Sequence, residues 1–305
     1  MRILILGAGG TGGYYGARLA AAGCDVRFLL RPDSAQRVSR DGLRLSSVRG
    51  DLQWPVCVST VADGPADLVI LSCKAYDLEA AIAAITPAVG SHTLVLPLLN
   101  GLLHLERLDQ AFGRARVLGG MCNISVGRAP DGGIVHYNRY DELIFGARAP
   151  AAGPIDADKV AALFASAHFR SVQSQDIDQD MWEKFVFIAT LAGMTCALRS
   201  DIGRIASTGP GVQLMRDALA ECQAVAAASG YAVRPLANKL ASRAFTERGS
   251  TFAASMLRDL QAGHRTEAEH IVGDMVGRAA AAGLSHPCLR MALCHLQAYE
   301  QGLAA

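Results

Sequence analysis

The sequence predicts an α/β domain followed by an all-helical domain. Up to about residue 150, short apolar runs alternate with helix-like segments, and after about Asp176 every segment carries helical periodicity. Continuous apolar strands that alternate with helices are typical of a parallel sheet covered by helices on both faces. We therefore expect an α/β domain over residues 1–175 and an all-α domain over residues 176–305.

The composition indicates a globular protein. The chain has 305 residues, of which 51% are hydrophobic and 19% are charged, which suffices for two ordinary domains. A formal net charge of +1 gives no strong field that would attract nucleic acid or an anionic membrane. The uncharged helical stretch 185–198 is shorter than the roughly 20 residues that a membrane-spanning helix needs. The eight cysteines form no CxxC pair and indicate a reducing compartment, so we expect a cytoplasmic protein without nucleic-acid or membrane partners.

Four apolar runs predict the strands of the first domain. Helix-like segments separate the first run from the second and the third from the fourth. The predicted strands are Arg2–Gly7, Asp25–Leu30, Ala66–Cys73 and His92–Leu99. Beyond about Gly119, shorter runs broken by glycine predict hairpin-like strands that extend the same sheet.

The second domain is predicted to consist of helices that end at glycine or proline. The predicted helical segments are 180–199, 210–229, 235–246, 250–262, 266–282 and 287–302. Many of these helices are rich in alanine and could bury the interface of a homodimer. A homodimer is therefore a possible assembly, although no residue marks its interface.

The first strand runs into the stretch "ILILGAGGTGGYYGARLAAAG", which contains Gly7-x-Gly9-x-x-Gly12 between a strand and a helix. In this context the pattern is typical of a Rossmann-type dinucleotide site. Gly7 permits a tight turn, Gly9 lets the backbone approach a pyrophosphate, and Gly12 with Gly16 lets the helix pack closely on the sheet. The helix N-terminus then presents free N–H groups to the phosphates. The alternative is a glycine-rich turn without a ligand, and the context favours dinucleotide binding.

Arg31, at the end of the second strand, indicates which dinucleotide is bound. A protein that binds NAD usually carries Asp or Glu at this place, where it holds the ribose hydroxyls. A guanidinium fits a 2′-phosphate, whereas a carboxylate would repel it. We therefore predict NADP(H) as the cofactor. The alternative is that Arg31 is an ordinary surface arginine, and the nearby Asp33 is the main support for it.

Two polar residues follow the third and fourth predicted strands. Lys74 comes after "LVILSC", and Asn100 comes after "LVLPLL". Ligands of a doubly wound sheet bind beyond the carboxyl ends of its strands, so both residues are candidates for ligand contacts. The alternatives are a solvated turn lysine and a plain Asn-Gly turn.

At this point the sequence resembles a family, the ketopantoate reductases (2-dehydropantoate 2-reductases), over essentially its whole length. The motifs that carry the resemblance are the glycine loop with Arg31, "CKAYD" with Lys74, "LLNG" with Asn100, "WEKF" with Lys184, and "SMLRDLQAGHRTE" from Ser255 to Glu267. The last two are the specific ones, because their order and spacing in a helical second domain are not general Rossmann features. The resemblance implies NADPH-dependent reduction of a 2-keto acid, 2-dehydropantoate, to pantoate, a step toward pantothenate and coenzyme A.

The resemblance also implies a role for each polar residue. Lys184 would be the general acid that protonates the carbonyl oxygen as hydride arrives at carbon 2. Hydride addition builds an alkoxide, which a positioned cation stabilises before it gives up a proton. Glu267 would bond the substrate hydroxyl or the lysine, Ser255 would bind the substrate carboxylate, and Asn100 and Lys74 would border the nicotinamide and the substrate.

Each of these roles has a structural alternative. Lys184 could be a lysine at a helix end whose ammonium reaches solvent, and Glu267 could be an acidic residue in the first turn of a helix. His264, Glu267 and His270 suggest a metal cluster at first sight, but offsets of three and six do not share one helical face. We therefore predict no metal.

Three positions depart from the pattern of the family. The family has asparagine four, eight and eighteen residues after the lysine, where this sequence has Ile188, Ala192 and Ile202. Each neutral hydrogen bond lost would cost roughly 0.5–1.5 kcal/mol. The alternative to 2-dehydropantoate is then a 2-keto acid with fewer hydroxyls or a bulkier apolar group, or an imine. A non-catalytic protein that senses NADP(H) is the alternative from another class, but it would need neither Lys184 nor Glu267.

Overall fold

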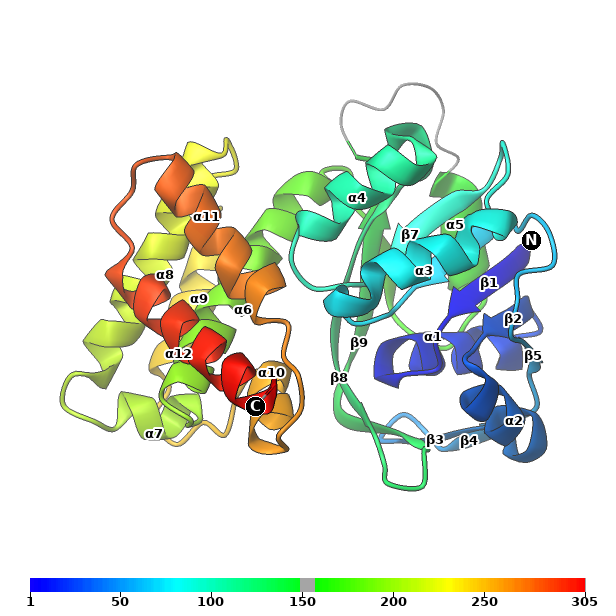
Figure 1. Cartoon of the computed structure of the whole chain (residues 1–305), viewed down its shortest axis with the longest axis horizontal. Helices are drawn as coiled ribbons and strands as arrows, with labels where there is room; N and C mark the ends of the chain where they lie inside the picture. The colour runs from blue at the N-terminus through cyan, green and yellow to red at the C-terminus, as the bar shows by residue number, and fades with distance from the viewer. Residues whose placement is uncertain (149–156, 305) are drawn as a thin grey trace. The chain divides into compact units, whose positions relative to one another are not determined.

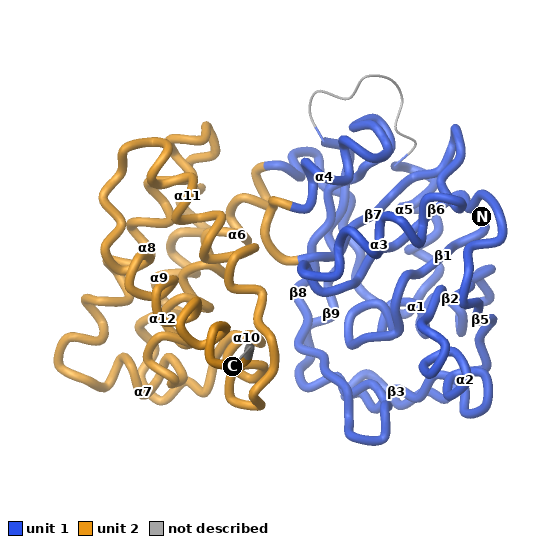
Figure 2. Tube along the Cα trace, viewed as in Figure 1, with its two compact units in different colours: residues 1–99, 104–178 blue, residues 100–103, 179–305 orange. Residues whose placement is uncertain are grey.

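The computed structural model describes residues 1–148 and 157–304 of the chain (Figure 1). The chain divides into two compact units (Figure 2). Unit 1 comprises Met1–Leu99 and His104–Asp178, and unit 2 comprises Asn100–Leu103 and Gln179–Ala305. The short segment after the fourth predicted strand therefore belongs with the helical unit.

Unit 1 contains a parallel sheet of five strands, as the alternating apolar runs predict. Its strand order is β5-β2-β1-β6-β7, and every pair is parallel. The strands are β1 (Arg2–Leu6), β2 (Asp25–Leu29), β5 (Cys57–Ser59), β6 (Leu68–Leu71) and β7 (Leu94–Pro97). Four of them coincide with the predicted runs, and β5 is an additional edge strand. The predicted α/β Rossmann-type domain followed by an all-α domain is confirmed.

The hairpin after Gly119 does not extend this sheet, and that part of the prediction is wrong. It forms a second sheet with order β10-β9-β3-β4, in which β8 pairs with β9. These strands are β3 (Leu43–Ser47), β4 (Leu52–Trp54), β8 (Gly119–Arg128), β9 (Ile134–Gly146) and β10 (Ser171–Gln173). An isolated parallel bridge between Val95 and Val117 precedes β8. A Cβ at Gly120 would lie 2.7 Å from the Pro97 carbonyl oxygen, so the glycine lets the chain cross the end of β7 and leave the first sheet.

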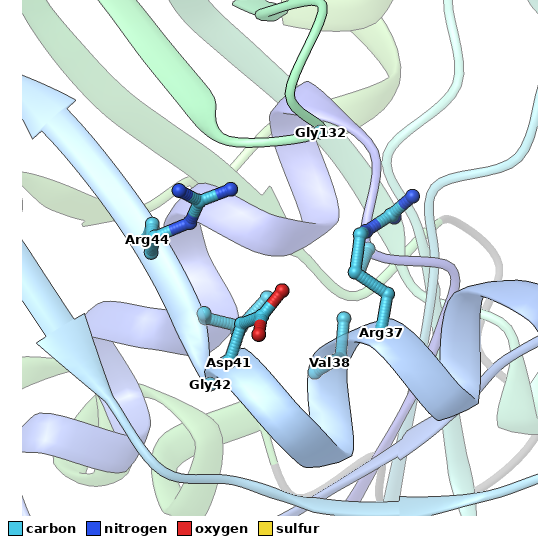
Figure 3. A pocket seen from close by; sticks show the side chains of 8 residues that line it. Arg37, Val38, Asp41, Gly42, Arg44 and Gly132 are labelled. Carbon is cyan, nitrogen blue, oxygen red and sulfur yellow. The ribbon is translucent and has the colours of Figure 1, made fainter.

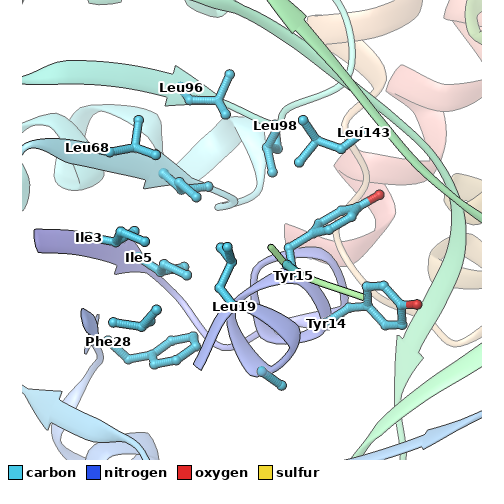
Figure 4. Packing of buried hydrophobic residues seen from close by; sticks show 14 of the residues in the cluster. Ile3, Ile5, Tyr14, Tyr15, Leu19, Phe28, Leu68, Leu96, Leu98 and Leu143 are labelled. Carbon is cyan, nitrogen blue, oxygen red and sulfur yellow. The ribbon is translucent and has the colours of Figure 1, made fainter. Parts of the chain in front are cut away.

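Helices cover both faces of the parallel sheet. The α-helices before β10 are α1 (Gly10–Ala21), α2 (Pro32–Asp41), α3 (Leu78–Ile85), α4 (Leu103–Phe112) and α5 (Ala157–Ala165), and the 3-10 turns are η1 (Ala75–Asp77), η2 (Thr86–Ala88) and η3 (Arg114–Arg116). Successive residues of β1 face opposite cores, because side chains alternate along a strand. Ile3 and Ile5 pack with α1 and the second sheet, whereas Leu4 packs with α3 and α4. Figure 4 shows the first of these cores, with Tyr14 and Tyr15 of α1 against it.

The regular elements of unit 2 are all helices in the part of the chain that the structure describes. These elements are α6 (Ile177–Ala197), α7 (Ile202–Ala206), α8 (Gly211–Ala228), α9 (Pro235–Thr246), α10 (Ser255–Gln261), the π-helical turn η4 (Glu269–Gly273), α11 (Asp274–Ala281) and α12 (Pro287–Ala304). Two details differ from the prediction. Residues 250–254 form no helix, so α10 begins only at Ser255, and the short helix α7 was not foreseen. Among the described residues, no helix has both the length and the apolar character needed to span a membrane.

Close packing between α1 and the sheet makes Gly16 a sensitive position. A Cβ there would lie 2.3 Å from Phe28 Cζ and 2.7 Å from Ile5 Cδ1, and both side chains are fully buried. We expect Gly16→Ala to lower the free energy of unfolding by about 1–3 kcal/mol, because the added methyl overpacks the core. Urea unfolding followed by circular dichroism measures this change.

Gly277 of α11 provides the matched control. It is also a helical glycine, but a Cβ there would meet no atom within 4 Å. Gly277→Ala should therefore raise stability by about 0.5–1 kcal/mol through helix propensity. A Gly16→Ala protein as stable as the wild type would contradict the close packing of α1.

Candidate active site

The glycine loop after β1 has the geometry that its three glycines predict. Gly7 has a φ of +89°, a conformation that favours glycine, and its N–H donates to the Leu29 carbonyl oxygen at 3.1 Å. A Cβ at Gly12 would lie 2.0 Å from the Ser72 Oγ and 2.8 Å from the Gly7 carbonyl oxygen. Only glycine therefore fits at position 12, where α1 meets the loop and the residue that follows β6.

Gly9 faces open space, in contrast to Gly12. It is the N-cap of α1, and a Cβ at this position would meet no atom within 4 Å. The first N–H groups of α1 lie directly behind it and have no partner within the helix. The positive end of the helix dipole and these donors favour a phosphate at this place. The loop thus fits the pyrophosphate of a dinucleotide.

Arg31 lies at the end of β2, where it caps α2. Its Nη2 donates to Oδ2 of Asp77 at 3.0 Å, and the arginine side chain is 78% exposed. Asp77 ends the turn η1, which begins directly after Lys74, so Arg31 and Asp77 link the ends of β2 and β6. Asp33, which the sequence analysis considered, lies in the first turn of α2. The contact with Asp77 joins residues 46 positions apart, and sequence spacing gave no signal for it.

A small pocket lies beside the glycine loop in unit 1 (Figure 3). Ala8 of the loop forms part of its wall, and Gly132 of the β8–β9 turn forms another part. Arg37 of α2 and Arg44 of β3 also line it, and Arg44 is paired with Asp131 at 3.1 Å. The pocket is distinct from the predicted substrate residues. Asp41 lines the pocket as well, so its wall carries a carboxylate beside the two arginines.

Asn100, which follows β7, belongs to unit 2 and lies next to His270 of η4. The turn after Asn100 requires glycine, since Gly101 has a φ of +80° and a Cβ there would lie 3.0 Å from Cδ2 of His270. Burial lowers the pKa of His270, while Glu267, Asp274 and a hydrogen bond with the Asn100 backbone oppose this shift. The imidazole therefore favours its neutral form in the folded chain.

Glu267 shares this environment. It is 8% exposed and lies directly before the helical turn that carries His270. Two predicted site residues thus act on one buried histidine: the Asn100 backbone through a hydrogen bond and Glu267 through its charge. From its place in the sequence, His270 suggests only a metal ligand, and spacing alone cannot show that Gly101 lies next to it. In residues 1–148 and 157–304, no three His, Cys, Asp or Glu side chains are arranged to hold a metal ion.

Lys184 lies on α6 and is half-buried, and its neighbours along the helix are held firmly. Trp182 stacks on Tyr231 with ring centroids 5.3 Å apart. Glu183 accepts from Nε of Arg234 at 2.7 Å; burial opposes its charge, but the bonds from Arg234 outweigh that effect and hold the pKa of Glu183 below its usual range. Anchors on both preceding residues fix the rotation of α6 and hence the direction of Lys184.

Ser255 is the first residue of α10 and is exposed. The residue before it is held from α6, because the Ala254 N–H donates to Oγ1 of Thr195 at 3.5 Å. The same Thr195 hydroxyl donates to the Leu191 carbonyl oxygen at 2.7 Å. Its bonds therefore position the start of α10. Ser255 and Glu267 lie on two successive segments, since α10 ends at Gln261 and Glu267 follows it.

The three positions that depart from the family pattern have different surroundings. Ile188 is half-buried and Ala192 is buried, both on α6, and they lie one and two turns beyond Lys184. Ile202 is fully buried at the start of α7, where its N–H donates to the Phe252 carbonyl oxygen at 2.9 Å. Ile202 is thus part of the core of unit 2, and α6 carries the apolar change nearest to Lys184.

Comparison with known proteins covers both units. A YkpB protein of Bacillus subtilis strain 168, an uncharacterized oxidoreductase, is 32% identical over 98% of this chain and 99% of its own length. The crystal structure of a PanE/ApbA family ketopantoate reductase from Ralstonia eutropha JMP134 matches with a TM-score of 0.89 and 28% identity over 100% of both chains. A ternary structure of D-mandelate dehydrogenase with NADH and anilino(oxo)acetate matches with a TM-score of 0.88 over 100% of both chains, but at 20% identity this likeness shows the fold alone.

Family models match nearly the whole chain. The model of ketopantoate reductase PanE/ApbA matches residues 3–150, which hold the glycine loop, Arg31, Lys74 and Asn100. The model of the ketopantoate reductase PanE/ApbA C-terminal domain matches residues 176–300, which hold Lys184 and Glu267. The chain therefore belongs to the ketopantoate reductase PanE/ApbA family, an oxidoreductase family.

Proposed function

We propose that this chain is an NADPH-dependent reductase of a 2-keto acid, with Lys184 as the general acid. One observation carries the proposal. The glycine loop is closed to side chains at Gly12 and open at Gly9, in a chain whose two halves both match models of the ketopantoate reductase family. The residues present in unit 1 fit a dinucleotide, which supplies the hydride when it is bound.

The cofactor contacts in this proposal come from the carboxyl edge of the parallel sheet. Gly7, Gly9 and Gly12 shape the loop, and the N-terminus of α1 holds the pyrophosphate. Arg31 binds the 2′-phosphate of NADP(H), since a guanidinium suits phosphate oxygens. Lys74, which precedes η1, lies on the nicotinamide side and supplies positive charge. Unit 1 is thus the cofactor domain, and unit 2 is the substrate and catalytic domain.

The proton chemistry belongs to unit 2. As hydride adds to carbon 2 of the keto acid, negative charge develops on its oxygen, and the Lys184 ammonium stabilises this charge and donates a proton. Lysine then regains a proton from solvent, so the charges balance. Glu267 bonds the new hydroxyl or Lys184, Asn100 orients the substrate beside the nicotinamide, and Ser255 binds its carboxylate. The hydrogen bond of the Asn100 backbone with His270, and the effect of the Glu267 charge on the same imidazole, support a shared role for these two residues.

The substrate is proposed at two levels. Reduction of 2-dehydropantoate to pantoate, in pantothenate and coenzyme A biosynthesis, is the reaction that the family name implies. Ile188 and Ala192 on the helix of Lys184 favour a more apolar 2-keto acid, or an imine, as the second candidate. A protein that only senses NADP(H) is disfavoured, because it would need neither Lys184 nor Glu267. A homodimer and a cytoplasmic location stay predictions from the sequence.

Replacement of Lys184 tests the proposal. Lys184→Ala should lower kcat for the best substrate by about 10²–10⁴-fold, because the proton donor is lost. The Kd for NADPH should change little, because the glycine loop and Arg31 are intact. Oxidation of NADPH at 340 nm and a fluorescence titration of NADPH measure these two quantities.

Lys239→Ala provides the control, since Lys239 is an exposed lysine on α9 of the same unit. It should retain wild-type turnover. A Lys184→Ala protein with undiminished turnover would contradict the role of the lysine. NADPH binding without turnover of any keto acid or imine by the wild type would favour the sensor.

A panel of substrates separates the two candidates. We expect 2-dehydropantoate to be turned over with a kcat/KM about 10–1000-fold below that of an apolar branched or aryl 2-keto acid, because amide contacts are missing. The double variant Ile188→Asn with Ala192→Asn should bring the two kcat/KM values closer together, because it restores two of the missing amides. Steady-state kinetics with NADPH, and with NADH as a control, give the ratios. Efficient reduction of 2-dehydropantoate by the wild type would instead mean that other groups replace the amides.

His270 should make stability depend on pH. Its pKa lies below the usual 6.5 in the folded chain, so the unfolded state takes up a proton first as the pH falls. The wild type should therefore lose up to about 1.4 kcal/mol per pH unit from this group below pH 6.5, and His270→Gln should remove that loss. Urea unfolding between pH 5 and pH 8 measures it.

His92→Gln, which replaces an exposed histidine in unit 1, is the control for this comparison. Its stability should follow the pH profile of the wild type. If His270→Gln followed that same profile, the buried imidazole would not be neutral.

A further inference from the structure

The arginine proposed to bind the 2′-phosphate already has a carboxylate beside it. Nη2 of Arg31 donates to Oδ2 of Asp77 at 3.0 Å, and the two side chains come from the ends of β2 and β6. Both remain accessible, since Arg31 is 78% exposed and Asp77 is 37% exposed. A ligand at the end of β2 would therefore meet a guanidinium and a carboxylate together.

We propose that Asp77 determines how strongly this chain discriminates between NADP(H) and NAD(H), by competing with the 2′-phosphate for Arg31. This inference rests on the proposed dinucleotide site. A guanidinium has five N–H donors in a fixed plane, so Arg31 can bind one oxygen of Asp77 and still offer donors to a phosphate. The two anions are then neighbours on one cation.

The charge on Asp77 acts differently on the two cofactors. A 2′-phosphate carries a charge of about −1.5 to −2, and at bonding distance from Arg31 it comes within roughly 4–6 Å of the Asp77 carboxylate. Repulsion at that distance in a partly exposed site weakens NADP(H) binding by about ten-fold or more. NAD(H) has a neutral hydroxyl at this position, which can donate to Asp77 as it does to the acidic residue of NAD-binding Rossmann sites. Asp77 therefore opposes NADP(H) and favours NAD(H).

The chain offers a matched ion pair that lies outside this site. Glu79, two residues after Asp77, accepts from Nε of Arg107 at 2.7 Å, and both partners are exposed. Exposed ion pairs contribute little to stability, so removal of either carboxylate should leave the fold intact. Asp77→Asn and Glu79→Gln each remove one negative charge while keeping the shape of the side chain. If the cofactor ratio changed only because one negative charge was lost, or because folding was disturbed nearby, the change would appear in both variants.

The test measures the Kd of NADPH and of NADH by fluorescence titration of the full chain at fixed ionic strength. We expect Asp77→Asn to raise the ratio Kd(NADH)/Kd(NADPH) by about ten-fold or more, mainly through tighter NADPH binding. Glu79→Gln should leave the ratio within about two-fold, as expected for an exposed pair. Arg31→Gln should lower the ratio by weakening NADPH alone. The effect of Asp77→Asn should shrink as salt is added, because exposed charges are screened.

The outcomes separate this inference from the proposed function. If Asp77→Asn had the same ratio Kd(NADH)/Kd(NADPH) as the wild type, the proposed role of Asp77 would be overturned. Asp77 would then only position the Arg31 side chain. An equal change in Glu79→Gln would overturn it too, since the effect would then come from net charge. Failure of both cofactors to bind the wild type would overturn the dinucleotide site and the inference together. Binding with the expected ratios but without keto acid turnover would support Asp77 and count against the proposed reaction.

Discussion

The close approach of α1 to the parallel sheet is the contact on which the cofactor end of the molecule depends. Gly12 and Gly16 leave room for Ser72 and Phe28, and this sets how near the helix axis lies to β1 and β6. With α1 held at this distance, its N-terminus at Gly9 lies beside open space. A bulkier helix face would move the N–H donors away from the strand ends, so packing and the proposed phosphate binding depend on the same glycines.

A second set of contacts gives the helical unit a fixed frame. Trp182 and Glu183 tie α6 to Tyr231 and Arg234. The π-helical turn η4 carries His270 into contact with the segment after β7. Such turns often occur at functional sites, because one extra residue shifts the side chains that follow. Polar residues distant in sequence are thus held by a few aromatic and charged neighbours.

Local pattern predicts much of this fold and only some of the site. Apolar runs identify β1, β2, β6 and β7, because a strand buried on both faces is apolar along its length. The hairpin β8–β9 was assigned to the wrong sheet, since its pairing with β3 and β10 depends on long-range contacts that periodicity does not report. The glycine loop can be predicted from the sequence because its motif is contiguous. The partner of Arg31 cannot be predicted in this way, because Asp77 lies 46 positions away in the sequence.

The assignment of Asn100–Leu103 to the helical unit has a consequence for how the protein can be divided. A fragment that starts at Gln179 would contain most of α6 and all of α7 to α12, but it would lack Asn100 and Gly101, which lie next to His270. A fragment that ends at Asp178 would keep those residues without their histidine. Neither piece is a self-sufficient folding unit in this respect. Gene fusions and domain exchanges within the family would have to carry this short loop together with the helices that it serves.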